Sequence, residues 1–166
     1  MIVNGWRLYV SQRFNEQLQL LEDQVEVFAA KDPIGCTERP VVKLLAAIQR
    51  LIFEVIPRDP NAPEFRQGKT LGAAHRHWFR AKFHQRYRLF YRFSSKEKVI
   101  VYAWMSDERT LRKSGSKTDP YHVFRGLLEA GDPPSTMEQL LARARNKRCS
   151  ISTASPAITR SSKRLA

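Results

Sequence analysis

Basic residues are concentrated between Arg76 and Lys98, a stretch that holds eight of them and one acid, Glu97. Aromatic residues, among them Trp78 and Phe90, lie between the cations. Cations hold phosphates and aromatic rings stack on bases, so this mixture suits a single-stranded nucleic acid. The eight basic residues are Arg76, Arg80, Lys82, Arg86, Arg88, Arg92, Lys96 and Lys98.

The first half of this stretch, Trp78–His84, alternates between aromatic or small residues and basic ones. That alternation predicts a strand, and strand side chains point to opposite faces in turn. Arg80, Lys82 and His84 are therefore expected on one face. Such a row is also typical of a solvated face on a basic protein, but eight cations beside one acid exceed what solubility requires.

The second half, Tyr87–Ser94, also predicts a strand, and its Arg88 and Arg92 are expected to share a face. If this face coincides with that of the preceding strand, the sheet presents a concentrated cationic surface. We expect Trp78 and Arg86 beside it to contribute to binding RNA.

A second basic segment, from Ser106 to Tyr121, leads into a predicted helix. Asp119 is suited to cap that helix, and the proline after it suits the first helical position. Phosphates bind well at such helix starts, where Tyr121 could supply a hydroxyl group. The cations of the segment are Arg109, Arg112, Lys113 and Lys117.

Metal and nucleotide sites are not indicated. The cysteines, Cys36 and Cys149, are far apart, and no cluster of His, Cys and carboxylate residues has ligand spacing. Gly68-Lys69-Thr70 is similar to the end of a phosphate loop, but Pro63 occupies the place of its first glycine. We therefore expect neither a cofactor nor a metal.

The order of predicted elements is strand, two helices, three strands and a helix, an α+β arrangement with the helices on one face of an antiparallel sheet. A helical hairpin should pack on that sheet. A short helix is expected over 135–145, and a basic, Ser/Thr-rich tail over 146–166 is expected to be disordered. The predicted ranges are Gly5–Val10, Phe14–Phe28, Pro40–Val55, Trp78–His84, Tyr87–Ser94, Val99–Trp104 and a helix from Pro120.

The formal net charge is +13, from 29 Lys and Arg against 16 Asp and Glu. Five bases and no acid lie from Asn146 onward, so removing five leaves +8 for the rest of the chain. A basic domain indicates a polyanionic partner, most often nucleic acid. No apolar run is long enough to span a bilayer, and we expect a cytoplasmic protein.

Trp78–Phe83, Arg86–Arg92 and Val99–Trp104 resemble the central strands of RelE-like toxins. Additional segments resemble the YhaV toxins within that superfamily, and the resemblance covers about residues 3–134. These segments are Asn4-Gly5-Trp6, Lys31-Asp32-Pro33, Phe65-Arg66-Gln67-Gly68-Lys69 and Lys117-Thr118-Asp119-Pro120-Tyr121.

This resemblance implies a RelE-like toxin domain over 1–134 and an endoribonuclease that cleaves messenger RNA, commonly on the ribosome. It also implies an AbrB-like antitoxin partner resembling PrlF. The residues that it points to are Arg80, Lys82, Arg88 and Tyr121, with Arg112 and Lys117 in the loop before the last of these.

Cleaving RNA without a metal requires the 2′-hydroxyl to lose a proton, the phosphorane to be stabilised and the 5′-oxygen to gain a proton. Arg88 suits the phosphate, while Arg80 and Lys82 suit positioning or proton transfer, and Tyr121 or His84 could act as base. Two other interpretations remain: a non-catalytic RNA-binding module, or an adaptor whose basic patch contacts an acidic protein.

Overall fold

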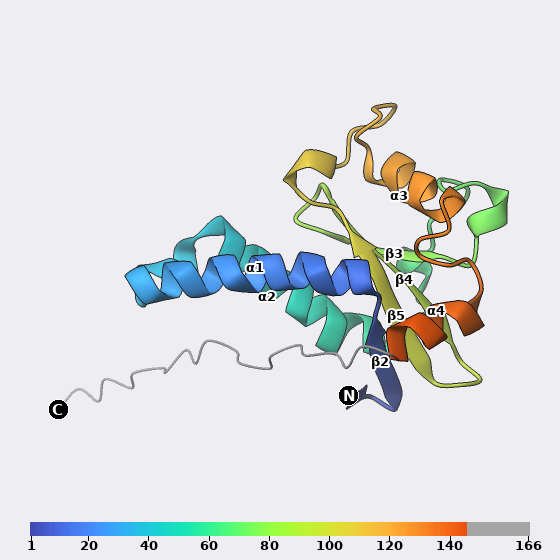
Figure 1. Ribbon diagram of the computed structural model, residues 1–166, viewed down its shortest axis with the longest axis horizontal. Helices are drawn as coiled ribbons and strands as arrows, with labels where there is room; N and C mark the ends of the chain where they lie inside the picture. The colour runs from blue at the N-terminus through green and yellow to red at the C-terminus, as the bar shows by residue number, and fades with distance from the viewer. Residues whose placement is uncertain (146–166) are drawn as a thin grey trace.

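One five-stranded sheet forms the centre of the protein in the computed structural model, which describes residues 1–145 (Figure 1). The strand order is β1-β2-β5-β4-β3. The strands are β1 (Ile2–Val3), β2 (Trp6–Val10), β3 (Phe79–Phe83), β4 (Tyr87–Ser94) and β5 (Val99–Met105). The three predicted central strands are confirmed, and they form an antiparallel meander.

The sheet is mixed, so the prediction of an antiparallel sheet is wrong at one position: β2 pairs with β5 in parallel. β5 therefore lies inside the sheet, between β2 and β4. All of its residues from Val99 to Met105 are buried, as expected for an interior strand with a continuous apolar sequence.

Helices cover both faces of the sheet, and the expectation that they lie on one face is wrong. α1 and α2 form the predicted hairpin and pack on one face, while α3 and α4 pack on the other (Figure 1). The helices are α1 (Gln12–Lys31), α2 (Pro40–Arg50), α3 (Pro120–Glu129) and α4 (Met137–Arg145).

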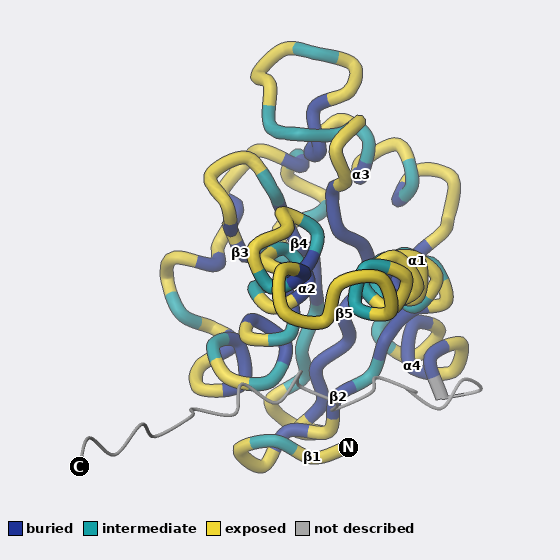
Figure 2. The backbone as a smooth tube through the Cα atoms, turned by 90° about the vertical axis from the view of Figure 1, so that its left-hand side faces the viewer, coloured by how far each residue is buried: buried dark blue, intermediate teal, exposed yellow. Residues whose placement is uncertain are grey.

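The alternation along β4 explains the two apolar layers. Leu89 and Tyr91 lie in the cluster that packs on α1 and α2, whereas Phe90 lies in the cluster that packs on α3. The ring of Phe90 stacks on that of Phe124 with a centroid distance of 4.3 Å. A strand that is apolar on both faces can be covered on both, and the tube in Figure 2 shows β5 and the central part of β4 buried.

The start of α1 is fixed to the central strand by Ser11. Its hydroxyl accepts a hydrogen bond from the Phe14 N–H (3.1 Å), as a helix cap does, and donates one to the Ala103 carbonyl (2.6 Å). α1 and α2 then extend beyond the sheet (Figure 1). α2 itself ends at Arg50, and the helical path continues through a wide turn over Leu51–Val55 and a short 3-10 turn over Ile56–Arg58, so it ends one residue after the predicted stop at Pro57.

The last described helix, α4, packs in the same apolar cluster as α3 through Leu140, Leu141 and Ala144. It matches the short helix predicted over 135–145. The tail from 146 to 166 lies outside the described residues. Within residues 1–145, no helix has the length and apolar character that a membrane crossing would require.

Candidate active site

Arg80 and Lys82 of β3 lie on the same face of the sheet as Arg88 of β4, a coincidence that the sequence had left open. In the register of this antiparallel pair, Lys82 is directly opposite Arg88 and Arg80 is opposite Phe90. Residues opposite one another in such a pair share a face, with Cβ atoms roughly 5 Å apart. This is the face that α3 covers, and the cations lie where the apolar cover ends.

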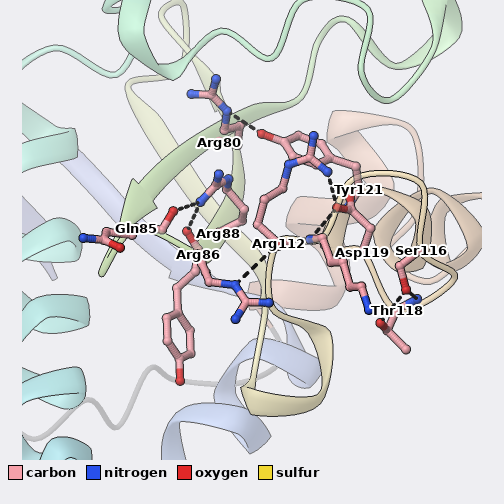
Figure 3. A network of polar contacts seen from close by, with 11 residues as sticks. Arg80, Gln85, Arg86, Arg88, Arg112, Ser116, Thr118, Asp119 and Tyr121 are labelled. Atoms are coloured by element: carbon pink, nitrogen blue, oxygen red, sulfur yellow. Dashed lines mark hydrogen bonds and ion pairs between the residues drawn. The ribbon is translucent and has the colours of Figure 1, made fainter.

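Arg88 is the buried member of this group, with 6% of its surface exposed. Its Nη1 donates to the carbonyl oxygens of Gln85 (2.8 Å) and Tyr87 (2.7 Å), and so closes the hairpin turn (Figure 3). Its backbone is paired with Ser106 in both directions, each at 2.8 Å. The Nε of Arg88 is buried and has no partner among the described residues.

A guanidinium in this state has one edge committed and one edge available. Arg88 Nη1 holds the turn, while the edge formed by Nε and Nη2 makes no hydrogen bond within residues 1–145. A buried, unpaired donor on a charged group is unfavourable, and an anion with two oxygens would satisfy that edge. The unpaired edge of Arg88 therefore has the donor geometry that suits an oxyanion.

Tyr121, at the start of α3, reaches the same region from a different element. Its hydroxyl oxygen accepts a hydrogen bond from Arg80 Nε (2.7 Å), and Arg80 Nη1 donates to the Glu64 carbonyl (2.6 Å). The ring packs edge-on against Phe90. The hydroxyl is thus held at the cationic edge (Figure 3), and its hydrogen has no acceptor among the described residues.

Asp119 organises the loop that brings Arg112 to Tyr121. Its carboxylate is 4% exposed, caps α3 by accepting from the Tyr121 N–H (3.1 Å), and also accepts from the Lys113 N–H (3.0 Å). The same carboxylate forms an ion pair with Arg112. The guanidinium of Arg112 lies 5.1 Å from the centre of the Tyr121 ring.

Arg86 connects this loop to the hairpin. Its Nε donates to the Arg112 carbonyl (3.2 Å), and its own carbonyl accepts from the Arg112 N–H (2.9 Å). Arg86 was expected to bind RNA; its side chain is exposed, and its contacts here hold the loop beside the hairpin. Lys117, which with Arg112 was predicted to bind RNA from this loop, is also exposed.

The electrostatic character of the site follows from these residues. Four cations surround it, and one of them, Arg112, is paired with a carboxylate, Asp119, within the described part of the chain. That carboxylate is already neutralised by Arg112 and by two backbone N–H groups. The site therefore favours a multiply charged anion. The four cations are Arg80, Lys82, Arg88 and Arg112.

Trp78 does not lie on the surface, so its expected role in stacking on RNA is wrong. It is fully buried, with its ring edge-on to Phe124 at 5.1 Å. Phe90 is also fully buried. Both residues lie on the same face of the sheet as Arg80. However, α3 covers this end of the face, so the two aromatic residues are part of the core.

Arg92 is likewise committed to structure, although it shares a face with Arg88. Its guanidinium lies over the Trp78 ring at 5.5 Å and donates to the Ser135 carbonyl. Partial burial lowers the pKa of this guanidinium. Arg92 is not placed to bind RNA.

The prediction that His84 shares a face with Arg80 and Lys82 is wrong. β3 ends at Phe83, and His84 begins the turn with a positive φ of 40°. Its side chain lines a groove between the hairpin and the helices α1 and α2, beside Tyr87. The histidine is therefore separated from Arg80 and Lys82, and it is not placed to exchange a proton with their ligand.

Two residues that organise the site were missed. Ser106 locks the backbone of Arg88, but a single serine after a strand carries no distinctive sequence signal. Asp119 was predicted as a helix cap, and its ion pair with Arg112 was not. An aspartate that comes seven residues after an arginine in a loop does not indicate that the two side chains meet.

The comparison with family models gives one match, to a family described as a toxin with endonuclease activity, of a toxin–antitoxin system, over residues 8–145. The chain is a member of the YhaV toxin family. The predicted resemblance is thereby confirmed. The described part of the chain and the part matched by the YhaV family end at the same residue.

Curated relatives support membership of the YhaV family. The chain is 46% identical over 140 residues to the ribonuclease toxin YhaV of Escherichia coli strain K12, a match that covers 83% of this chain and 91% of that protein. The toxin YhaV of Escherichia coli O6:H1 is similar to the same extent. No solved structure matches the chain. The family's endonuclease activity favours the enzyme over the non-catalytic RNA-binding module and over the adaptor.

Proposed function

We propose that the protein is a ribonuclease that cleaves messenger RNA without a metal ion, by attack of a 2′-hydroxyl on the adjacent phosphate. The name of the relative from strain K12 supports RNA as substrate. The observation that carries the proposal is the buried guanidinium of Arg88, which has an edge without a hydrogen bond, at a position directly opposite Lys82 on the neighbouring strand. These groups fit a phosphodiester and its developing charge.

Phosphate stabilisation is assigned to Arg88 and Arg112. Attack of the 2′-oxygen on phosphorus forms a phosphorane with an additional negative charge, which a preorganised cation stabilises more than it does the starting phosphodiester. Arg88 is already desolvated and fixed by its two carbonyl contacts. It therefore needs little rearrangement when that charge develops.

Proton transfer is assigned to Lys82 and Tyr121. Arginine keeps its proton under ordinary conditions, so Lys82, acting as the neutral amine, is the basic side chain of the hairpin face that takes the proton from the 2′-hydroxyl and becomes the ammonium ion. The hydrogen of the Tyr121 hydroxyl, which has no acceptor among the described residues, can pass to the leaving 5′-oxygen. The P–O5′ bond then breaks, leaving a 2′,3′-cyclic phosphate and a 5′-hydroxyl.

Arg80 is a positioning residue in this scheme. It holds the Tyr121 hydroxyl at 2.7 Å while the Glu64 carbonyl holds Arg80 in turn. A metal has no part in the proposed reaction. Residues 1–145 contain no group of three or more His, Cys, Asp or Glu side chains suited to hold one.

The partners follow from the family and from charge. A toxin–antitoxin system includes an antitoxin, and we propose one of the AbrB type, similar to PrlF, that covers the cationic face with an acidic segment. We also propose a cytoplasmic protein that acts on messenger RNA at the ribosome. The net charge of +13 suits an encounter with ribosomal RNA as well as with the message.

The proposal is tested by adding the antitoxin-free protein to messenger RNA, with and without ribosomes, and mapping new 5′ ends. Lys82→Ala should reduce the cleavage rate by at least about a hundredfold, the usual contribution of a proton-transfer group. Lys96→Ala is the matched control, because it removes an exposed lysine from the β4–β5 turn of the same sheet. Its rate should remain within about twofold of wild type.

The proposed reaction is wrong if the folded wild type makes no cuts under either condition. If Lys82→Ala cuts as fast as Lys96→Ala, the proposed ribonuclease activity stands but the assignment of proton transfer to Lys82 is wrong. A ribosome requirement would appear as cuts that form only in the presence of ribosomes.

A further inference from the structure

A pocket of about 260 Å³ lies beside the candidate active site, on the outer side of Arg112 and Tyr121. The loop before α3, the start of α3 and the segment around Thr70 form its walls. It shares Arg112 and Tyr121 with the site, so the two are contiguous. The remaining lining residues are Ser114, Gly115, Ser116, Lys117, Asp119, His122 and Arg125.

Three loop residues in the lining of this pocket have unused backbone donors. Within the described residues, the N–H groups of Ser114, Gly115 and Lys117 make no hydrogen bond, although their neighbours do. Gly115 has a φ of 79°, a conformation that favours glycine and turns successive N–H groups toward one side. Exposed N–H groups of this kind bind anions.

The loop is also held in shape without a ligand. The Ser116 and Thr118 hydroxyls are 2.9 Å apart, and the Asp119 N–H donates to the Ser116 carbonyl (3.1 Å). Figure 3 shows these residues next to the Arg112–Asp119 pair. Binding therefore does not require the loop to be ordered first, which reduces the entropic cost of association.

The charge around the pocket is positive. Lys117, Arg125 and Arg112 line it, together with His122 and the hydroxyl-bearing Thr70. Asp119 is the carboxylate in the lining, and its charge is already balanced by Arg112. Arg125 also contacts Glu129, outside the lining, at 3.8 Å, a weak exposed contact that an anionic ligand can displace.

We propose that this pocket binds a phosphate of the RNA strand that flanks the bond to be cut. The inference rests on the proposed function, because the active site fixes one phosphate and the contiguous pocket then receives a neighbouring one. Hydroxyl groups, free N–H groups and cations match a phosphate better than a base, which would require an apolar surface. The pocket thus sets where the strand lies.

The first test uses phosphate ligands and the full-length protein. Inorganic phosphate and adenosine 3′,5′-bisphosphate should shift the backbone amide NMR signals of Ser114, Gly115 and Lys117 in a saturable manner. The double variant Lys117→Gln with Arg125→Gln should weaken this binding about tenfold. The inference is wrong if these signals do not move, or if only the antitoxin moves them.

The second test measures affinity for a 2′-O-methyl RNA that cannot be cut. The pocket variant should bind about tenfold more weakly. Its affinity should also fall less steeply with salt concentration, by the amount expected for the loss of roughly one phosphate contact. The matched control is Lys96→Gln with Arg50→Gln, which removes the same charge and breaks an equivalent helical pair, Arg50 with Glu54. If both variants lose the same affinity for RNA, the pocket contributes only through the general positive charge of the protein and is not a specific phosphate site.

These tests separate the two proposals. If the wild type cuts no RNA but the three amides bind phosphate, the pocket stands as an anion site and the proposed reaction fails. If RNA is cut and the pocket variant behaves as its control does, the reaction stands and the pocket is not used.

Discussion

Replacing Arg88 with alanine should reduce the rate of RNA cleavage by at least about a hundredfold, the usual loss when one preorganised donor to a developing oxyanion is removed. The effect is expected to be large because Arg88 is desolvated and its Nε–Nη2 edge is unpaired before substrate binds. The rate is measured on messenger RNA under single-turnover conditions, so that binding and chemistry can be separated.

Arg88→Ala also removes the two contacts that close the hairpin turn, at Gln85 and Tyr87. The free energy of unfolding should fall by about 1–3 kcal/mol, so cleavage must be measured where the variant is folded. Ser106→Ala is the matched control, because it loses the hydrogen bond to the Arg88 backbone and leaves the guanidinium in place. It should lose stability and keep most of its activity.

Arg88→Lys distinguishes charge from shape at the same position. Lysine keeps the positive charge but not the fork that holds two carbonyls and faces a phosphate with a second edge. The variant should cut faster than Arg88→Ala and more slowly than wild type. If Arg88→Ala, folded, cuts at the wild-type rate, the guanidinium is purely structural and its assignment to the phosphate is wrong.

Replacing Tyr121 with phenylalanine should slow cleavage about a hundredfold while leaving the fold intact. The ring would keep its contacts with Phe90 and with the Arg112 guanidinium, and only the hydroxyl would be lost. Arg80 would lose its partner at 2.7 Å, but its contact with Glu64 would remain. The measurement is the single-turnover rate together with a thermal unfolding curve.

Tyr91→Phe is the control for this change. Tyr91 is a fully buried tyrosine on the opposite face of the sheet, and its hydroxyl donates to the Pro60 carbonyl (2.8 Å). Burial raises the pKa of this phenol, so it remains a neutral donor. The variant should lose about 1 kcal/mol of stability and retain its activity. If Tyr91→Phe slowed cleavage as much as Tyr121→Phe, the hydroxyl of Tyr121 would have no special role.

Local pattern was sufficient for the strands of the hairpin and for the order of the cations along each strand. Alternation placed Arg80 and Lys82 on one face, while the register that brings Arg88 opposite Lys82 was left open by the sequence. Both features depend on the two-residue period of a strand, which is readable along a few residues. The ends of β4 were also predicted correctly.

Trp78 and His84 show where local pattern stops being informative. Alternation correctly assigns Trp78 to the face of Arg80, but α3 covers that end of the face, and packing between distant elements leaves no local trace. His84 depends on a boundary: β3 ends one residue earlier than predicted, and the left-handed turn directs the side chain to another surface.

Contacts between residues that are far apart in the sequence could not be predicted from local sequence pattern. Arg80 and Tyr121 are 41 positions apart and meet through the packing of α3 on the sheet. Alternation pointed to Arg80, and the resemblance to RelE-like toxins pointed to both residues, but neither indicated that they are in contact. Asp119 could be recognised as a cap, but its second role, fixing Arg112, depends on the path of the intervening loop.

The chemistry of the cut ends tests the central proposal most directly. Antitoxin-free protein is incubated with messenger RNA in excess EDTA, with ribosomes where cleavage requires them, and the new ends are analysed. We predict undiminished cleavage that leaves a 5′-hydroxyl and a 2′,3′-cyclic phosphate or its hydrolysis product. Cleavage that leaves a 5′-phosphate, or that stops in EDTA while the ribosomes remain intact, would contradict attack by the 2′-hydroxyl at a metal-free cationic site.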